Sequence, residues 1–329
     1  MTIRMPAEWE PHEWLWIGFP WNAQEWGGED TMAQAQAQLC AFADAVRASG
    51  KGEEVRLVCK DAQSAEAAKA LLTSDVKIVI EPIGDVWLRD TGPIGVADTE
   101  GNRSLADFRF NGWGGKYEMP GDADIGARLA ATCPLPCHAV PLVFEGGAVD
   151  TDGTGLFVTT EDCLLNPNRN PGLDKRQIET LLAGSLGLRD MLWLGDGLVN
   201  DHTDGHVDNL ARFVAPGVIA IPQATTDDDP NSAIYADASA RAKAGGLIVA
   251  PMPSPGRVEA GGSVVPASYM NFLIGNAVVI VPTYGRPNDT AALEALKPFF
   301  PTREVVALPS DAILAGGGSF HCTSQQMPA

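Results

Sequence analysis

The sequence predicts an α/β fold, because segments with helical periodicity alternate with short β-rich runs along all 329 residues. No Pro/Ser-rich linker or break in composition divides the chain, so we expect residues 1–329 to form a single domain. A weak internal repeat supports this organisation. Residues 217–222 and 276–282 are both strand-like runs that end at a proline and follow another strand after a short polar turn. Repeated strand–turn–strand–helix–strand units would produce this pattern.

Amphipathic helices are predicted wherever apolar residues recur at the spacing of one helical face. In the first such segment these residues run from Ala35 to Val46, and Thr31 is a capping-type residue at its start. The predicted helices, in chain order, are residues 31–48, 61–72, 125–131, 175–186, 232–244 and 290–299.

Strands are predicted where short runs are rich in β-branched, aliphatic and aromatic residues. Most of these runs lie directly before or after a predicted helix, as an alternating fold requires. In chain order they are residues 54–59, 76–81, 106–110, 139–144, 156–159, 207–214, 218–221, 247–250, 272–274, 278–281 and 304–308.

The composition is that of a globular protein with a strongly acidic surface. Apolar residues make up 45% and charged residues 20%, which allows a sizeable core. Lys+Arg 23 against Asp+Glu 42 gives a net charge of −19. Such a surface repels nucleic acid and anionic lipid and attracts small cations. We therefore expect a small cationic partner, with no nucleic acid and no membrane.

Two further features indicate a cytoplasmic protein. No stretch approaches the ~18 consecutive apolar residues of a transmembrane helix, and the N-terminal residues 1–14 lack the apolar core of a signal peptide. The cysteines are scattered along the chain, and without an export signal we expect them to be reduced thiols. They are Cys40, Cys59, Cys133, Cys137, Cys163 and Cys322.

The densest polar cluster is residues 201–208 (DHTDGHVD), which lead into the predicted strand 207–214. Alternate residues of a strand share a face, so His206 and Asp208 are expected to project side by side. A carboxylate beside a histidine orients the ring and raises its pKa, which suits general acid/base catalysis. The alternative is a turn in which Asp and Thr side chains bond to the local backbone.

The same cluster also suggests a metal site. His202 and His206 are four residues apart, and Asp204 or Asp208 would supply a third ligand. Gly205 argues against the helix that this spacing normally needs. A metal-dependent amidohydrolase built on His202, His206 and Asp208 is thus an alternative function, although we expect no metal. Cys133 and Cys137 enclose two prolines and are interpreted as part of a loop.

The C-terminal stretch holds a candidate nucleophile. Gly316, Gly317 and Gly318 let the backbone approach a ligand closely, and Cys322 follows them. A cysteine in this position, with His and Asp available elsewhere, is a candidate for nucleophilic catalysis. The alternative is a buried cysteine that acts as a small apolar residue.

Other candidate residues are less specific. Trp87 and Asp90 would supply an aromatic wall and a carboxylate at the end of a strand, or else a core tryptophan and a turn aspartate. Glu145 ends the apolar run 140–144, where a glutamate usually reaches solvent. Trp113 lies in a glycine-flanked loop that is either a lid or an ordinary surface loop.

Taken together, these motifs resemble the agmatine deiminases, a group also called Porphyromonas-type peptidylarginine deiminases, within the guanidine-modifying superfamily. The matching segments run in order along nearly the whole chain: residues 5–9, 87–93, 110–114, 145–147, 165–171, 203–209, 269–272 and 316–326. The chain departs from the family's pattern in two places. It reads Cys322-Thr-Ser-Gln-Gln326 where members commonly read Cys-Ile-Thr-Gln-Gln, and it has His202 where we expect an acidic or otherwise different residue.

The resemblance implies a pseudo-fivefold α/β propeller (pentein) of ββαβ-type units around a central active site. It assigns Cys322 as nucleophile, His206 as general acid/base and Glu145 as the partner of His206. It also assigns Asp90 and Asp208 to the guanidinium, and Trp87 and Trp113 to the walls around the aliphatic part of the substrate. A guanidinium is planar and permanently charged, and its paired N–H groups match carboxylates in bidentate fashion.

The implied activity is hydrolysis of agmatine to N-carbamoylputrescine and ammonia through a covalent thiouronium intermediate, in polyamine (putrescine) biosynthesis. We expect no metal and no organic cofactor. We expect the protein to form a homodimer or a larger homo-oligomer. Alternatives are a deiminase of another guanidino compound such as arginine or peptidylarginine, and a non-catalytic guanidine-binding protein on the same scaffold.

Overall fold

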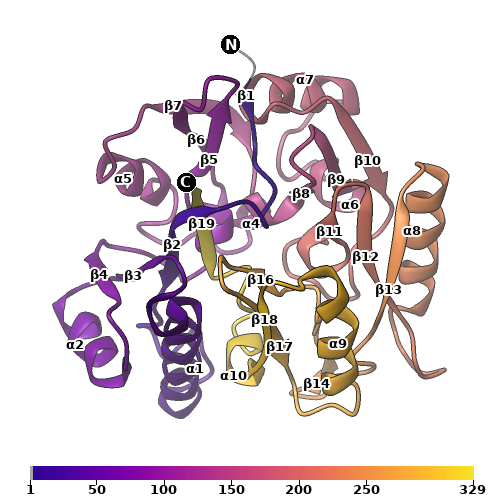
Figure 1. The fold of residues 1–329 in the computed structure, drawn as a ribbon. Coiled ribbons are helices and arrows are strands. Elements are labelled where there is room, and N and C mark those ends of the chain that lie inside the picture. Colours follow the sequence, from indigo (N-terminus) through magenta and orange to yellow (C-terminus); the bar gives the residue numbers. More distant parts are fainter. Residues whose placement is uncertain (1–2) are drawn as a thin grey trace.

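The structure is a computed structural model that describes residues 3–329. The first two residues of the N-terminal stretch, where we expect no signal peptide, lie outside the described residues. Helices and strands alternate along the chain, which confirms the predicted α/β class. Figure 1 shows α2, α5, α7, α8 and α9 at the periphery of the molecule, with most strands lying inside them.

Five sheets share one plan, in which an antiparallel strand pair is followed by a helix and a strand parallel to the second member of the pair. Parallel neighbours need such a crossover, and a helix usually makes it. In the described part of the chain these are separate sheets and none closes on itself. The elements of the first three are β5 (Ile94–Asp98), β6 (Arg103–Arg109), α5 (Ile125–Ala131) and β7 (Cys137–Val143); β8 (Val149–Thr151), β9 (Leu156–Thr160), α7 (Lys175–Leu186) and β10 (Asp190–Leu194); and β11 (Arg212–Ala215), β12 (Val218–Gln223), α8 (Ser232–Ala244) and β13 (Ile248–Pro253).

Of the remaining two sheets, the fifth brings the ends of the chain together. In the fifth, the C-terminal strand pairs antiparallel with a strand near the N-terminus, with Gln325 opposite Trp16. The elements of the fourth sheet are β16 (Leu273–Ile274), β17 (Val278–Thr283), α9 (Asp289–Leu296) and β18 (Glu304–Pro309). Those of the fifth are β19 (Ser324–Pro328), β2 (His12–Gly18), α1 (Glu29–Arg47), β3 (Glu54–Cys59), α2 (Ala62–Leu71) and β4 (Lys77–Ile80). The short strand β1 (Ile3–Arg4) adds to the edge of β5, and β14 (Glu259–Ala260) pairs with β15 (Ser263–Val264).

Local sequence explains where several helices begin. Asp61 caps α2, because its side chain accepts from the backbone of Ser64 while the Ser64 hydroxyl accepts from the Asp61 backbone. The prediction that Thr31 caps the first helix is wrong. α1 starts after Gly28, so Glu29 and Asp30 occupy its first turn, where their charge complements the helix dipole.

The predicted strand 207–214 is also wrong in its first half. Residues Val207–Asn209 form a 3-10 turn, closed by the Leu210 and Ala211 amides, which both donate to the Val207 carbonyl. The strand β11 starts only at Arg212. His206 and Asp208 therefore do not share a face of a strand, and their approach to one another has to come from the turn.

Several strands are not predicted by the sequence patterns, among them β2, β5, β10 and β19. The clearest case is β19, whose residues Ser324, Gln325 and Gln326 have a polar composition that is atypical of a core strand. All of its residues are buried, and Gln325 accepts a hydrogen bond from Arg89. Its burial depends on partners far away in the sequence.

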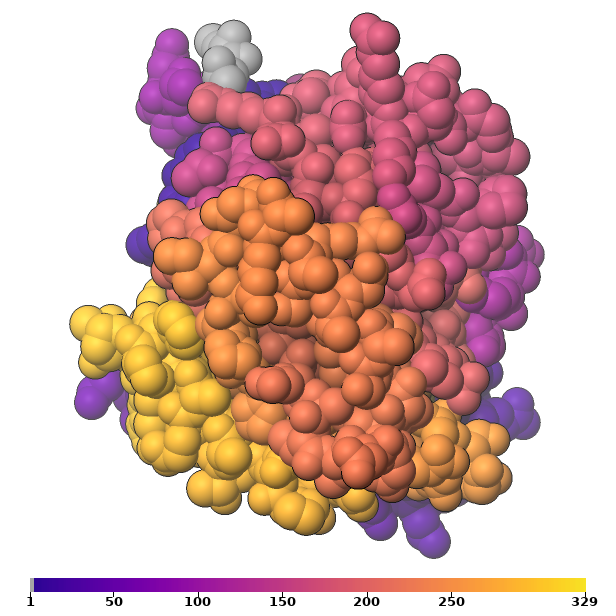
Figure 2. Space-filling view, turned by 90° about the vertical axis from the view of Figure 1, so that its right-hand side faces the viewer, coloured from indigo at the N-terminus to yellow at the C-terminus, as the bar shows by residue number. Residues whose placement is uncertain are grey.

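The apolar core lies between the helices and their sheets. One cluster packs α1 against β2, β3 and β17 and extends to Trp87, Trp113 and Cys322. Figure 2 looks at the molecule from the side of α8, whose residues cover the middle of this face. No helix in the part of the chain that the structure describes is long and apolar enough to cross a membrane. All six cysteines lie within that part and are free thiols.

Candidate active site

Four of the predicted site residues line a single small pocket. It has a volume of about 150 Å³, and Cys322, Asp90, Trp87 and Trp113 all contribute to its wall. The three glycines 316–318 complete the wall beside the cysteine. A larger groove of about 680 Å³ lies beside α8 and contains none of the predicted site residues. The 150 Å³ pocket is the candidate active site because the reactive groups converge there.

The carboxylate of Asp90 is held by hydrogen bonds from two segments. Asp90 lies in the short helix α3 (Leu88–Thr91) rather than at the end of a strand, which corrects the prediction. Its Oδ1 accepts from the Gly147 amide at 3.1 Å, and its Oδ2 accepts from the Trp113 indole at 2.9 Å. Burial raises the pKa of Asp90 to about 6, against the opposing effect of the nearby His206.

The loop that carries Trp113 is part of the pocket wall. Trp113 lies in the short helix α4 (Gly112–Gly115) with φ 52° and ψ 51°, a left-handed conformation that is costly for a side chain of this size. The Asn111 side chain accepts from the Gly114 amide at 2.9 Å and stabilises the turn. The Trp113 ring is 5% exposed. The ring therefore lies buried against the pocket, while residues 115–118 of the same loop are exposed.

Cys322 lies in the turn that leads into β19 and forms two hydrogen bonds with the side chain of Asn271. The Asn271 amide donates to the Cys322 sulfur at 2.9 Å, while its oxygen accepts from the Cys322 backbone at 3.1 Å. Asp208 Oδ2 is 3.5 Å from the same sulfur. Burial raises the pKa of Cys322 well above its ordinary value, and the charges of Asp208 and Asp90 add to this effect. The thiol is thus held in place in its protonated form.

Behind Asp208 lies a buried chain of charged groups. His321 contacts Asp208 Oδ2 through Nδ1 at 2.7 Å and Glu8 Oε2 through Nε2 at 2.8 Å. Both ring nitrogens of His321 therefore face carboxylate oxygens, one from each end of the chain of contacts. Burial opposes ionisation of Asp208, but the hydrogen bond and charge of His321 outweigh it and lower the pKa of Asp208. Asp208 therefore stays a carboxylate.

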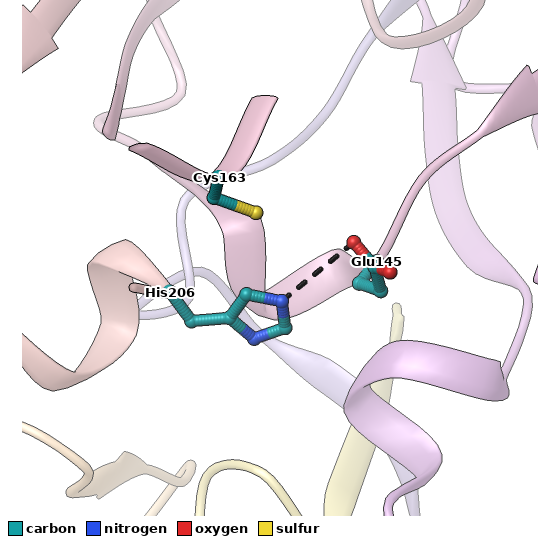
Figure 3. Close-up of side chains that lie close together, drawn as sticks. All are labelled: Glu145, Cys163 and His206. Carbon is teal, nitrogen blue, oxygen red and sulfur yellow. Dashed lines mark ion pairs between the residues drawn. The ribbon is translucent and has the colours of Figure 1, made fainter. Parts of the chain in front are cut away.

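His206 and Glu145 lie at the back of the pocket, and both are fully buried. His206 Nδ1 is 3.5 Å from Asp90 Oδ1, and Nε2 is 3.7 Å from Glu145 Oε2, the ion pair drawn in Figure 3. Arg169 donates to the other Glu145 oxygen at 3.0 Å. The expectation that Glu145 reaches solvent is wrong, because Arg169 and His206 compensate its buried charge. Burial disfavours the charged ring, but Asp90, Cys163 and Glu145 together raise the pKa of His206 well above its ordinary value.

The site leaves several polar atoms without a partner. Within residues 3–329, Asp208 Oδ1, Glu145 Oε2 and both ring nitrogens of His206 are buried and form no hydrogen bond. A Cβ placed on Gly147 would lie 2.6 Å from His206 Nδ1 and 2.8 Å from Asp90 Oδ1. It would also lie 3.1 Å from Asp208 Oδ2, so three elements converge on the space that this glycine leaves open. Buried acceptors without partners are costly, and a planar cation with several N–H donors would satisfy them.

The structure does not bring together the three residues of the alternative metal site. His202 is exposed at the pocket wall, whereas His206 and Asp208 are buried. In the described part of the chain, the group of His, Cys, Asp or Glu ligands that lie within 4.8 Å of one another is Glu145, Cys163 and His206. The predicted His202–His206–Asp208 geometry is therefore absent from residues 3–329.

Reasoning from the sequence misses several residues that contact the site. Asn271 and Glu8 lie inside segments that match the family, 269–272 and 5–9, but nothing in their spacing indicates a contact with Cys322 or His321. His321 directly precedes Cys322, and no pattern shows that it lies between two carboxylates. Cys163 lies in α6 (Glu161–Leu164), where it resembles an ordinary core cysteine.

Comparison with known proteins identifies the family. The family model for the Porphyromonas-type peptidyl-arginine deiminase matches residues 4–328. The agmatine deiminase of Stutzerimonas stutzeri is 38% identical over 99% of this chain and 95% of its own length. The solved agmatine deiminase of Enterococcus faecalis is 31% identical with a TM-score of 0.92, over 99% of this chain and 96% of that one.

A C. jejuni agmatine deiminase with substrate bound is also similar. It is 27% identical to this chain with a TM-score of 0.91, over 100% of this chain and 97% of that chain. These similarities extend over the whole fold and include every segment that contributes to the pocket. The chain belongs to the Porphyromonas-type peptidyl-arginine deiminase family.

Proposed function

We propose that this protein is an agmatine deiminase, a hydrolase that converts agmatine and water to N-carbamoylputrescine and ammonia. One observation carries the proposal. The Cys322 thiol and the Asp90 carboxylate line one small pocket, with the Asp208 carboxylate 3.5 Å from the sulfur and His206 3.5 Å from Asp90. The agmatine deiminases of S. stutzeri and E. faecalis, to which the chain is similar, support the choice of substrate.

The proposal also concerns the arrangement of the sheets and the protein's place in the cell. We infer that the five ββαβ sheets form one domain, arranged as a pseudo-fivefold propeller with the pocket at its centre. The recurrence of the same strand order in all five supports this arrangement. A place in polyamine synthesis, a cytoplasmic location and a homo-oligomeric state stay predictions.

Binding of the guanidinium is assigned to Asp90 and Asp208. Two carboxylates fix the plane of this cation and leave one face of its central carbon open to the Cys322 sulfur. The unpartnered Asp208 Oδ1 gains a donor when the cation enters. Trp87 and Trp113, which both line the pocket, cover the aliphatic part of the substrate.

The first half of the reaction is attack by sulfur. The cationic substrate offsets the carboxylate charges that hold the Cys322 thiol protonated, so we infer that the thiolate forms with substrate bound. The thiol proton is released to solvent, and the sulfur adds to the guanidinium carbon. His206 gives a proton to the departing nitrogen, and the loss of ammonia leaves a thiouronium on Cys322. In the free protein, ultraviolet thiolate absorbance should be missing at neutral pH, and its presence would contradict this step.

The second half is hydrolysis of the thiouronium. His206, now neutral, takes a proton from water, and the hydroxide adds to the same carbon. The carbon–sulfur bond then breaks as the proton of the added hydroxyl passes to the departing sulfur, which returns the Cys322 thiol and releases the neutral ureido product. Glu145 keeps His206 oriented and stabilises its charged form, and Arg169 fixes Glu145 in turn.

The charged residues that line the pocket favour an amine over an amino acid. Asp85 and Glu25 both line it, whereas none of its lining residues within the described chain is a lysine or arginine. An α-carboxylate would need an arginine such as Arg89 or Arg169, but neither lines the pocket: Arg89 donates to Gln325, and Arg169 to Glu145. The acidic lining therefore complements a second positive charge on the substrate, whereas a substrate carboxylate would find no positively charged partner in the pocket.

The first test compares ureido-product formation from agmatine and from arginine in excess chelator, with Cys322→Ala as control. Agmatine turnover that survives the chelator and is lost in Cys322→Ala is the expected result. Turnover of arginine instead would keep the cysteine mechanism and change the substrate. Activity that the chelator abolishes and Cys322→Ala retains would support the metal-dependent alternative.

A further inference from the structure

One buried thiol close to the site has no part in the proposed reaction. Cys163 is fully buried, and its sulfur lies within 4.8 Å of ligand atoms of Glu145 and His206. Figure 3 shows its side chain directed toward the space between these two residues. We call these three residues the rear cluster. They come from different parts of the fold: the loop after β7, the helix α6 and the turn before β11.

The backbone holds the rear cluster together. Thr160 caps α6 by accepting from the Cys163 amide at 3.3 Å. The same hydroxyl donates to the Gly205 carbonyl at 2.6 Å, directly before His206. Arg169 fixes the third member through Glu145 Oε1. The sulfur, the ring and the carboxylate are therefore presented on well-anchored backbone, as a preorganised ligand set requires.

The free atoms of the rear cluster point to a ligand. Glu145 Oε2 and His206 Nε2 are buried without a hydrogen-bond partner in the described chain, and they lie 3.7 Å apart. Two ligand atoms of one tetrahedral zinc ion, each about 2.0–2.2 Å from the metal, are separated by a similar distance. Thiolate, imidazole and carboxylate are together a donor set typical of zinc rather than of magnesium or calcium.

We propose that Glu145, Cys163 and His206 form an inhibitory binding site for a zinc-class divalent cation at the back of the active site. A divalent ion takes the place of the Cys163 thiol proton and one proton of His206, which are released to solvent. The net charge of the cluster is thus unchanged, and the buried site needs no further counter-charge. The bound ion occupies His206 Nε2 and stops this ring from cycling a proton.

The position of the site sets the type of inhibition. His206 Nδ1 faces Asp90 and the substrate pocket, whereas Nε2 faces the rear cluster. A metal on Nε2 leaves Asp90, Asp208 and Cys322 free to bind the guanidinium. Zinc that has reached equilibrium with the protein should therefore lower kcat by ~100-fold or more, since general acid/base catalysis contributes that much, and leave KM nearly unchanged. An ion held by Cys322 would instead compete with agmatine and raise KM.

The decisive experiment detects the metal without relying on activity. Co²⁺ is added to Cys322→Ala protein, which has lost the competing thiol of the pocket, and the thiolate-to-cobalt charge-transfer absorbance is recorded. We expect the band in Cys322→Ala and its loss in the double variant with Cys163→Ala. A double variant with Cys40→Ala, which removes a buried thiol of the α1 core instead, should keep the band.

Zinc inhibition of agmatine turnover is then compared between the wild type and Cys163→Ala, each relative to its own zinc-free rate. Loss of the inhibition in Cys163→Ala is expected. A cobalt band that persists without Cys163, no band in any variant, or inhibition that is competitive with agmatine would each overturn the proposal. None of these outcomes affects the proposed deiminase activity, which is measured in excess chelator.

Discussion

At the scale of single residues, the reactivity of Cys322 depends on the two groups that contact its sulfur. Asn271 donates a hydrogen bond to it, which favours the thiolate, while the carboxylate of Asp208 lies 3.5 Å away and favours the thiol. In the free protein burial and the carboxylates prevail, and the pKa of Cys322 is raised. Asn271 is thus the group that keeps the thiolate attainable when substrate binds.

Replacing Asn271 by aspartate tests this role at nearly constant size. The variant places a carboxylate where the wild type has a donor, so the pKa of Cys322 should rise further. We expect kcat/KM for agmatine to fall by about 10- to 100-fold, the equivalent of one hydrogen bond to a charged group. Alkylation of Cys322 as a function of pH should shift to higher pH. Asn276→Asp, which alters an asparagine that contacts His12 and Glu53, is the control. An unshifted alkylation profile in Asn271→Asp would contradict the role.

The pKa of Asp90 predicts the acid side of the pH profile. Asp90 binds the guanidinium only as a carboxylate, and burial raises its pKa to about 6. The value of kcat/KM should therefore be maintained above pH 6 and fall as the pH drops below it. In Trp113→Phe the indole donor that stabilises the carboxylate is lost, so this decline should move to higher pH. A profile that stays in place or moves to lower pH would show that Asp90 does not control binding.

At the scale of elements, the loop around α4 has to hold a strained backbone against the pocket. Gly114 and Gly115 both have positive φ, +83° and +79°, but only Gly114 packs closely. A Cβ on Gly114 would lie 2.3 Å from the Asn168 side chain, whereas nothing lies within 4 Å of one on Gly115. The two positions share the backbone strain and differ in the clash.

Substitution of these two glycines by alanine separates the effect of backbone strain from the effect of displacing the loop. Both changes should lower stability slightly, by about 1 kcal/mol, because alanine is disfavoured at positive φ. Only Gly114→Ala should displace Trp113 and raise KM for agmatine, since the wall of the pocket moves with the loop. Steady-state kinetics and urea unfolding of both variants provide the comparison. Equal KM values would mean that the packing of Gly114 does not position Trp113.

Reading the elements from sequence succeeds where one segment is locally self-consistent. The prediction of a helix at 175–186 is confirmed, because its apolar face and the Asp174–Gln177 capping box lie within the segment itself. It fails for β19 and for the turn at Val207–Asn209. The polar β19 is buried by β2 and Arg89, which lie far away in the sequence. The turn is closed by the backbone amides of Leu210 and Ala211, which no residue pattern predicts.

At the scale of the whole molecule, Glu8 joins the start of the chain to the active site at its end. Its carboxylate accepts from Arg212 at 2.6 Å, from the Ile274 amide at 2.7 Å and from His321 at 2.8 Å. The first two partners belong to different sheets, and His321 precedes the nucleophile. Burial opposes ionisation of Glu8, but Arg212 and His321 lower its pKa well below the ordinary value.

Glu8→Gln should therefore destabilise the fold strongly. Removing one charge of a buried ion pair leaves its partners uncompensated and costs about 3–5 kcal/mol. Glu10→Gln is the matched control, because Glu10 pairs with Arg4 in partly exposed positions and such a pair contributes ~1 kcal/mol or less. Urea unfolding measures both. Equal free energies of unfolding would refute the view that Glu8 links the sheets.

The sequence by itself determined the fold class, the family and the types of group present in the site. Those follow from periodicity and from ordered short motifs, which are properties of neighbouring residues. The tertiary structure decided which groups meet and in which state of charge. His321 and Glu8 are 313 positions apart, and His321 and Asp208 are 113 apart. The roles of Asn271, His321 and Cys163 could not be predicted, because burial and the distance between charges set a pKa and a ligand geometry, and both arise only when distant segments pack together.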